Sequence, residues 1–344
     1  MSNTFDPNSA STNHSGIFGL EFAESEAKLV LLPVPWEATT SYGSGASLGP
    51  SAILAASKQV DLYDTELGHF YQNGIVMANC NPLINKWNGE AVPLASRIIE
   101  NGGIKNIDSV FSKEVNRVNE LSEQVNELVY QETKRYLKKN KWVGTIGGDH
   151  SSPFGAIKAH VERYPDLGIL QIDAHLDLRN AYEGFTYSHA SIMYNVITRL
   201  GVQKLVQVGI RDICEQEYKM VKQSSGKITA FFDKDLVNKK FQGNTWQQIC
   251  TEIVNQLPEM IYISFDIDGL EPSLCPHTGT PVPGGLNYSE FRFLIGEVVR
   301  SGRKIIGFDL CEVTPVSDTE WDANVGSRVL FSLIGWLFKS NNQA

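Results

Sequence analysis

The sequence lacks the features of disulfide-bonded, secreted or membrane-spanning proteins. Its five cysteines are odd in number, scattered and without a Cys-x-x-Cys pair, so neither a disulfide framework nor a zinc ribbon is indicated. No apolar run reaches the roughly 18 residues that a membrane span needs. Residues 1–16 are rich in Ser and Asn and contain no basic segment followed by an apolar one. We therefore expect no secretory signal, no contact with a membrane and a cytoplasmic location.

Positive charge is also scarce. Thirty Lys and Arg face 39 Asp and Glu, which leaves a net charge of −9, and the basic residues form no long run. A surface that binds nucleic acid needs clustered positive charge, so we expect no nucleic-acid partner. Hydrophobic residues make up 42% of the 344 residues, which is enough for one large core without disulfides.

The apolar residues alternate between two patterns along the chain. Short β-branched runs, each ended by Gly, Pro or Asp, occur at 28–33, 142–146, 168–172, 205–208, 228–232, 261–265 and 304–308. Helical periodicity occurs between them, at 113–139, 152–163, 246–257, 289–300 and 324–337. This alternation predicts an α/β fold with a parallel sheet covered on both faces. Without a break in composition, we expect a flexible arm over 1–25 and a single catalytic domain over 26–344.

Four of the apolar runs are followed at once by polar residues that can do chemistry. In a parallel sheet the carboxyl ends of the strands lie at one edge, where ligands bind. The four motifs are Gly147-Gly148-Asp149-His150-Ser151, Asp173-Ala174-His175-Leu176-Asp177, Asp266-Ile267-Asp268 and Asp309-Leu310-Cys311-Glu312. One such motif alone commonly serves as a turn or a helix cap, but three or more after different strands are hard to explain in that way. We predict that their side chains converge on one crevice.

The charges within these motifs favour a metal site. The carboxylates at the expected strand ends are Asp173, Asp177, Asp266 and Asp268. Buried charges persist only when they are paired or bound to metal, and Arg179 is the one nearby cation of the sequence. Two divalent cations would balance four carboxylates, with His150 and His175 as neutral nitrogen donors. Carboxylate and imidazole ligands without thiolate favour Mn²⁺, while Ni²⁺, Co²⁺ or Fe²⁺ would also suit them.

Three stretches together resemble the signature motifs of the ureohydrolases, the arginase/agmatinase family. They are residues 147–151, 173–177 and 264–272, and the resemblance extends from about residue 28 to 337, including 43–50, 278–281 and 309–315. It implies a three-layer α/β/α fold with a mainly parallel sheet, as in arginases and deacetylases. It also implies a binuclear manganese centre and hydrolysis of a small guanidino substrate to an amine and urea.

Carried over residue by residue, the resemblance implies two overlapping ligand sets. One ion would be held by His150, Asp173, Asp177 and Asp266. The other ion would be held by His175, Asp173, Asp266 and Asp268. Asp173 and Asp266 would then bridge the two ions.

The resemblance also assigns three catalytic residues. Two metals would activate a water for attack on the guanidinium carbon, and Asp177 would relay the proton to the leaving nitrogen. Glu312 matches the glutamate that anchors the guanidinium, because a carboxylate pairs with two N–H groups in a fork. His189 matches the histidine near the substrate entrance and is a candidate proton shuttle.

The stretch that would contact the substrate tail favours an agmatinase. Arginases carry Asn where this chain has Arg179, and residues 177–190 look more like agmatinases of archaea and bacteria. Ala190 and His277 stand where the family usually has Gly, and both lie near the expected tail. We expect agmatine to be converted to putrescine and urea, with Arg179 and His277 as candidate substrate-contacting residues.

Arg179 distinguishes between the possible substrates. A free arginine would repel the cationic tail of agmatine, so an agmatinase should pair Arg179 with a carboxylate such as Glu183 or Asp212. A substrate carboxylate could instead bind Arg179 if the protein were an arginase or a guanidino-acid hydrolase. The sequence also leaves open a guanidine hydrolase, a formimidoylglutamase and, from another class, a deacetylase-like metal hydrolase. By resemblance, we also expect a homo-oligomer, either a trimer or a hexamer.

Overall fold

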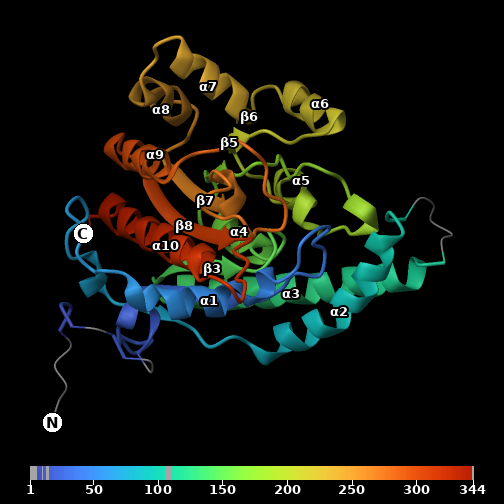
Figure 1. Cartoon of the computed structure of the whole chain (residues 1–344), viewed down its shortest axis with the longest axis horizontal. Coiled ribbons are helices and arrows are strands. Elements are labelled where there is room, and N and C mark those ends of the chain that lie inside the picture. Colours follow the sequence, from blue (N-terminus) through green and yellow to red (C-terminus); the bar gives the residue numbers. More distant parts are fainter. Residues whose placement is uncertain (1–5, 10, 13–14, 105–109, 343–344) are drawn as a thin grey trace.

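A central sheet of eight parallel strands organises the fold, as a computed structural model of the chain shows (Figure 1). The structure describes residues 6–9, 11–12, 15–104 and 110–342. The strand order is β2-β1-β3-β8-β7-β4-β5-β6. In chain order the strands are β1 (Leu29–Val34), β2 (Ile75–Met77), β3 (Trp142–Gly147), β4 (Gly168–Ile172), β5 (Lys204–Ile210), β6 (Ile228–Phe232), β7 (Met260–Asp266) and β8 (Lys304–Cys311).

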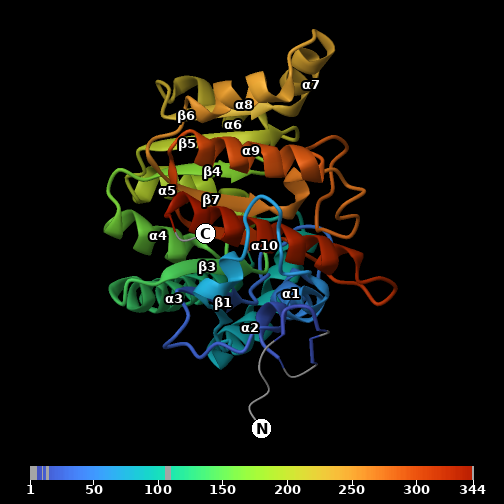
Figure 2. The same cartoon turned by 90° about the vertical axis from the view of Figure 1, so that its left-hand side faces the viewer.

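Helices cover both faces of this sheet, so the predicted three-layer α/β/α architecture is confirmed. They are α1 (Gly49–Ala56), α2 (Pro82–Glu100), α3 (Ser112–Lys138), α4 (Phe154–Arg163), α5 (Ile192–Arg199), α6 (Glu215–Gln223), α7 (Asp233–Phe241), α8 (Trp246–Val254), α9 (Tyr288–Arg300) and α10 (Trp321–Ser340). In Figure 2 the strands lie between α3, α4 and α5 on the left and α1, α9 and α10 on the right.

The strands form because both of their faces are apolar. Leu29 and Leu31 of β1 pack into the same cluster as residues of α9 and α10, whereas Val30 and Leu32 pack against α3 and α4. Side chains alternate between the faces of a strand, so an uninterrupted apolar run fits a strand that is covered on both sides. The apolar stripe predicted for residues 113–139 is likewise the buried face of α3.

All seven predicted apolar runs are strands, but β2 was not predicted. It has only three residues and pairs with β1 at the end of the sheet, so it leaves little periodic signal. Helix α2 was also missed, because Pro93 lies inside it and interrupts the expected pattern. The start of this helix is nevertheless marked in the sequence, since Asn81 caps it and Pro82 is its first residue.

Part of the expected N-terminal arm is packed rather than solvated. Ile17, Phe18 and Leu20 are buried in the core, and the Phe18 ring lies edge-on against Phe331 of α10 at 5.1 Å between centroids. The backbone N–H of Phe18 donates to Ser57 Oγ at 2.9 Å. The arm expected over 1–25 is thus packed against the core at residues 17–20, while residues 1–5, 10, 13 and 14 lie outside the described part of the chain.

None of the described helices is long and apolar enough to cross a bilayer.

His160 of α4 supplies a prediction about stability. Its buried ring lies edge-on to Tyr262, its Nδ1 is 2.8 Å from Ala156 O, and burial lowers its pKa from 6.5 to about 4. At a pH between the two pKa values, about 4 and 6.5, His160 is protonated in the unfolded chain but not in the folded protein. The free energy of unfolding therefore falls as the pH drops from 6.5 through 4. The loss is about 3 kcal/mol at most.

The measurement is urea unfolding from pH 7 to pH 4 of the wild type and of His160→Gln. We expect the variant to be less stable at pH 7 and to lose less stability on acidification. If the free energy of unfolding falls equally with pH in both proteins, protonation of His160 does not contribute to the loss of stability.

Candidate metal centre

The four polar motifs meet at one edge of the sheet, as predicted. His150 follows β3, Asp173 follows β4, Asp266 ends β7 and Glu312 follows β8. These strands are consecutive in the order β3-β8-β7-β4, at the centre of the sheet. Because all of them are parallel, their carboxyl ends bring the side chains together although the residues are far apart in the sequence.

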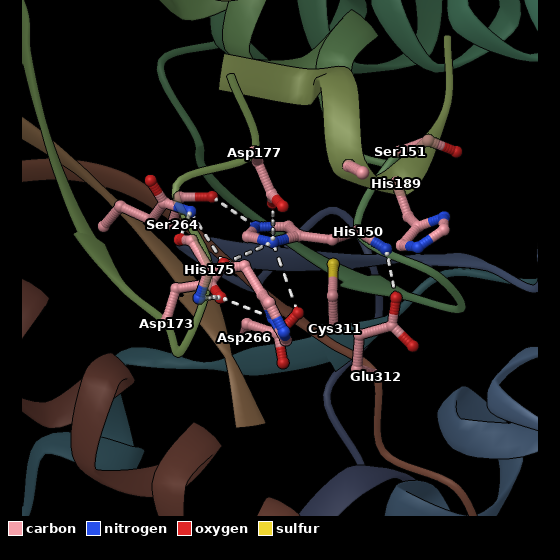
Figure 3. Close-up of polar contacts among 12 residues, drawn as sticks. His150, Ser151, Asp173, His175, Asp177, His189, Ser264, Asp266, Cys311 and Glu312 are labelled. Carbon is pink, nitrogen blue, oxygen red and sulfur yellow. Dashed lines mark hydrogen bonds and ion pairs between the residues drawn. The ribbon is translucent and has the colours of Figure 1, made fainter. Parts of the chain in front are cut away.

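A first group of ligand-type atoms surrounds the ring of His150 (Figure 3). His150 Nδ1 lies 3.0 Å from Asp173 Oδ2, 3.0 Å from Asp177 Oδ2 and 3.3 Å from Asp266 Oδ2. All four side chains are buried. The group contains the four residues that the resemblance implied for one ion.

A second group lies around His175. Its Nδ1 is 3.1 Å from Asp268 Oδ2 and 3.5 Å from Asp173 Oδ1. The carboxylate of Asp268 accepts from Ala174 N at 3.0 Å, and that of Asp173 accepts from His175 N at 2.6 Å. Asp173 thus presents one oxygen to each group, as a bridging ligand would.

These groups fit a metal site. His150 Nδ1 is buried without a hydrogen-bond partner although three carboxylates surround it, which suits a nitrogen that binds a cation. Burial, and next the charge of Asp173, raise the pKa of Asp177 to about 7. Burial, and next the charge of Asp268, raise the pKa of Asp266 well above its usual range. A divalent cation would relieve both penalties, because it compensates buried negative charge.

Further polar residues hold the ligand-type side chains in place. His150 Nε2 lies 2.9 Å from Ser264 Oγ, which donates to Asp309 Oδ1 at 3.1 Å. Gln171 Nε2 donates to Asp173 Oδ2 at 2.7 Å, and Gln207 Nε2 donates to Gln171 Oε1 at 2.6 Å. Sequence reasoning assigned none of these roles. The signal available was one glutamine within the apolar run of each of two strands, Gln171 in β4 and Gln207 in β5.

Asp177 and Glu312 both adopt the left-handed backbone conformation, with φ of 53° and 64°. Such conformations are costly for residues other than glycine and cluster at functional sites. Glu312 Oε1 accepts from His150 N at 2.9 Å, which ties the glutamate to the first group. Burial, and next the charge of Asp149, raise the pKa of the Glu312 carboxyl well above its usual range.

His189 lies at a cavity of about 150 Å³ that reaches His175 and Asp177. Its backbone N–H donates to Thr39 Oγ1 at 3.0 Å, and its Nε2 is 3.4 Å from Ser41 Oγ. Burial, and next the positive charge of His175, lower the pKa of His189 to about 4. His189 therefore presents a neutral imidazole beside the predicted ligands.

The two candidate substrate-contacting residues differ in position. Arg179 lines the cavity, its Nε lies 3.7 Å from Glu217 Oε2, and its guanidinium stacks 4.7 Å from the ring of Tyr182. This partner is neither of the two carboxylates that the sequence suggested. His277 is not among the residues that line the cavity; its Nδ1 lies 2.8 Å from Asp322 Oδ2 at the start of α10.

The fold and this site define a class, the α/β proteins with buried carboxylate and imidazole groups that fit a metal site at the edge of a parallel sheet. The chain belongs to the arginase family, whose sequence model matches residues 27–335. It is 33% identical to the N(1)-aminopropylagmatine ureohydrolase of Thermus thermophilus over 290 residues, or 84% of each chain. It is 27% identical to the agmatinase of Bacillus subtilis, over 91% of this chain and 92% of the relative.

Solved structures show the same fold. The agmatine ureohydrolase of Thermoplasma volcanium superimposes with a TM-score of 0.72 over 93% of both chains at 23% identity. The chain is therefore a ureohydrolase similar to agmatinases, and a deacetylase-like hydrolase is set aside.

Proposed function

We propose that this protein hydrolyses agmatine to putrescine and urea. The observation that carries the proposal is the pairing of Arg179 with Glu217. Arg179 is the only arginine or lysine among the described residues that line the cavity, and the buried carboxylate of Glu217 neutralises it. Asp212, which also lines the cavity, leaves 68% of its side chain exposed. This balance of charge suits a substrate tail that ends in an ammonium group rather than a carboxylate.

The six ligand-type residues would hold two divalent cations. His150, Asp173, Asp177 and Asp266 would hold one ion. His175, Asp173, Asp266 and Asp268 would hold the other. Their carboxylate and imidazole donors favour Mn²⁺, while Ni²⁺, Co²⁺ or Fe²⁺ would also suit them. Such ions supply a water that is deprotonated near neutral pH.

Residues of the chain would bind the substrate and transfer the protons. Glu312 is held by His150 N, which donates to its side chain, and by Gly148 O, which accepts from its backbone N–H. Its carboxylate would receive two N–H groups of the guanidinium in a fork. Asp177 lines the cavity and would pass the proton of the attacking water to the leaving nitrogen. His189 lines the same cavity and would act as the proton shuttle by accepting a proton, because its pKa of about 4 keeps the imidazole neutral at pH 7. Water adds across one C–N bond, and the products are urea and a free amine.

The test is urea release from a panel of guanidino compounds after loading with Mn²⁺ or Ni²⁺. The panel contains agmatine, N1-aminopropylagmatine, arginine and a guanidino acid. We expect agmatine to have the highest kcat/KM. A higher value for arginine or for the guanidino acid would overturn the proposal.

N1-aminopropylagmatine is the second candidate substrate. Relatives that carry this name are 33% and 27% identical to the chain over most of its length. The tail of this compound contains a secondary amine, ends in a primary amine and carries no carboxylate, so the charge argument applies to it equally. The ratio of its kcat/KM to that of agmatine decides between the two.

Arg179→Lys tests the role of the cavity arginine. Lysine keeps the charge but loses the planar group that stacks on Tyr182, so we expect a stability loss of about 1 kcal/mol. The order of preference among the panel substrates should stay the same, with agmatine first. If the wild type prefers an acidic substrate and the variant alone loses that preference, Arg179 binds a substrate carboxylate instead. Thermal unfolding and the same panel give both measurements.

A further inference from the structure

The loop at residues 271–281 is tied to the start of α10 by three hydrogen bonds. Asp322, the second residue of α10, is 1% exposed, and both of its carboxylate oxygens face His277. Oδ1 accepts from His277 N at 3.0 Å, and Oδ2 lies 2.8 Å from His277 Nδ1. Beside them, Trp321 Nε1 donates to Ser273 O at 2.9 Å.

The next residues of the same loop contact Glu312. The buried Thr278 donates from its Oγ1 to Glu312 O at 2.9 Å. Gly279 lies beside the glutamate side chain, since a Cβ on Gly279 would lie 3.6 Å from Glu312 Oε2, at ordinary van der Waals distance. The loop thus reaches from α10 to the carboxylate that we propose as the guanidinium anchor.

Glu312 needs such support because its φ of 64° is unfavourable for glutamate. Three hydrogen bonds hold it. Glu312 N donates to Gly148 O at 2.8 Å, and His150 N donates to the side chain at 2.9 Å. The third comes from Thr278, which is the residue after His277. Two restraints therefore belong to the turn after β3, and one belongs to the loop.

We propose that His277 and Asp322 form a positioning pair for Glu312, acting through Thr278 on the glutamate backbone. The inference rests on the proposed role of Glu312 in binding the guanidinium. His277 then affects substrate binding without touching the substrate, which departs from the direct contact expected from the sequence.

The main test is the steady-state kinetics of Asp322→Ala and His277→Ala. Glu312 contacts the guanidinium both before and during the reaction, so a misplaced anchor mainly weakens binding. We expect KM for agmatine to rise about 10-fold while kcat changes less than about 3-fold. Asp322→Asn should stay near the wild type, because Asn Oδ1 can accept from His277 N and its amide nitrogen can still face His277 Nδ1. Metal content should remain unchanged in all three variants.

Thr245→Ala is the matched control. It removes the cap of α8, another helix N-terminus but one that does not contact the loop, so it should lower the melting temperature and leave KM unchanged. If Asp322→Ala and His277→Ala lose stability with KM unchanged, the pair is only structural and the inference fails. If Asp322→Ala does not fold, His277→Ala decides, since it leaves the backbone bond to Asp322 in place.

Combining the variants separates this inference from the proposed function. In a Glu312→Gln background, Asp322→Ala should raise KM much less than it does alone, because the anchor is already lost. An equal rise in both backgrounds would mean that the pair acts elsewhere. If Glu312→Gln itself keeps wild-type kinetics, the anchor role fails, whatever Asp322→Ala does.

Discussion

Treatment with a chelator such as EDTA abolishes urea release, and readdition of Mn²⁺ restores it, if the buried groups hold the proposed ions. The expected loss is on the order of 10³-fold or more, because bound metal supplies several kcal/mol of stabilisation to such a hydrolysis. Elemental analysis of the active protein should give two ions per chain.

Single substitutions distinguish the two ion positions. Asp173 offers one oxygen to each group, so Asp173→Asn should weaken the binding of both ions. Asp268 belongs to the group around His175, so Asp268→Asn should lower the metal content from two ions per chain toward one. Asp235→Asn, on the exposed side of α7, is the matched control and should retain both ions. Fully active protein with one ion or none would refute the binuclear centre.

Glu312→Gln should lower kcat/KM on the order of 10²-fold, at roughly 3 kcal/mol for the loss of a buried charge-assisted pair. Glutamine keeps the shape of the side chain, and its carbonyl oxygen can still accept from His150 N. What is lost is the negative charge that would face the guanidinium, so metal content should stay near two.

Glu290→Gln is a suitable control, because Glu290 belongs to the capping box of α9 and not to the site. It should change stability slightly and leave kcat/KM unaltered. A near-normal kcat/KM of Glu312→Gln would show that another group anchors the substrate.

The convergence of the metal-type residues could be predicted because it follows from local sequence. Asp173 and Asp266 come at the ends of recognisable apolar runs, and parallel strands place such ends together. Family membership, which the motifs suggested, is also confirmed.

Long-range partners could not be predicted. Arg179 pairs with Glu217, and His277 pairs with Asp322, across 38 and 45 residues. No periodic spacing links such positions, because loops and helix ends set their distance. The packing of Phe18 on Phe331 is a similar case, since a short apolar segment in a Ser- and Asn-rich stretch gives no periodic signal. Substrate choice depends on these same loops, and relatives at about 30% identity do not fix it.

The strand order has a consequence for synthesis on the ribosome. Strand β8, from the last part of the chain, lies between β3 and β7, so it joins β2-β1-β3 to β7-β4-β5-β6. A nascent chain that ends before β8 already contains every residue that we propose as a metal ligand. His150, however, belongs to the first group of strands, whereas Asp173 and Asp266 belong to the second. The group of ligand-type residues around His150 can therefore come together only after β8 has been translated, whereas the group around His175 lies entirely on the β7-β4 side.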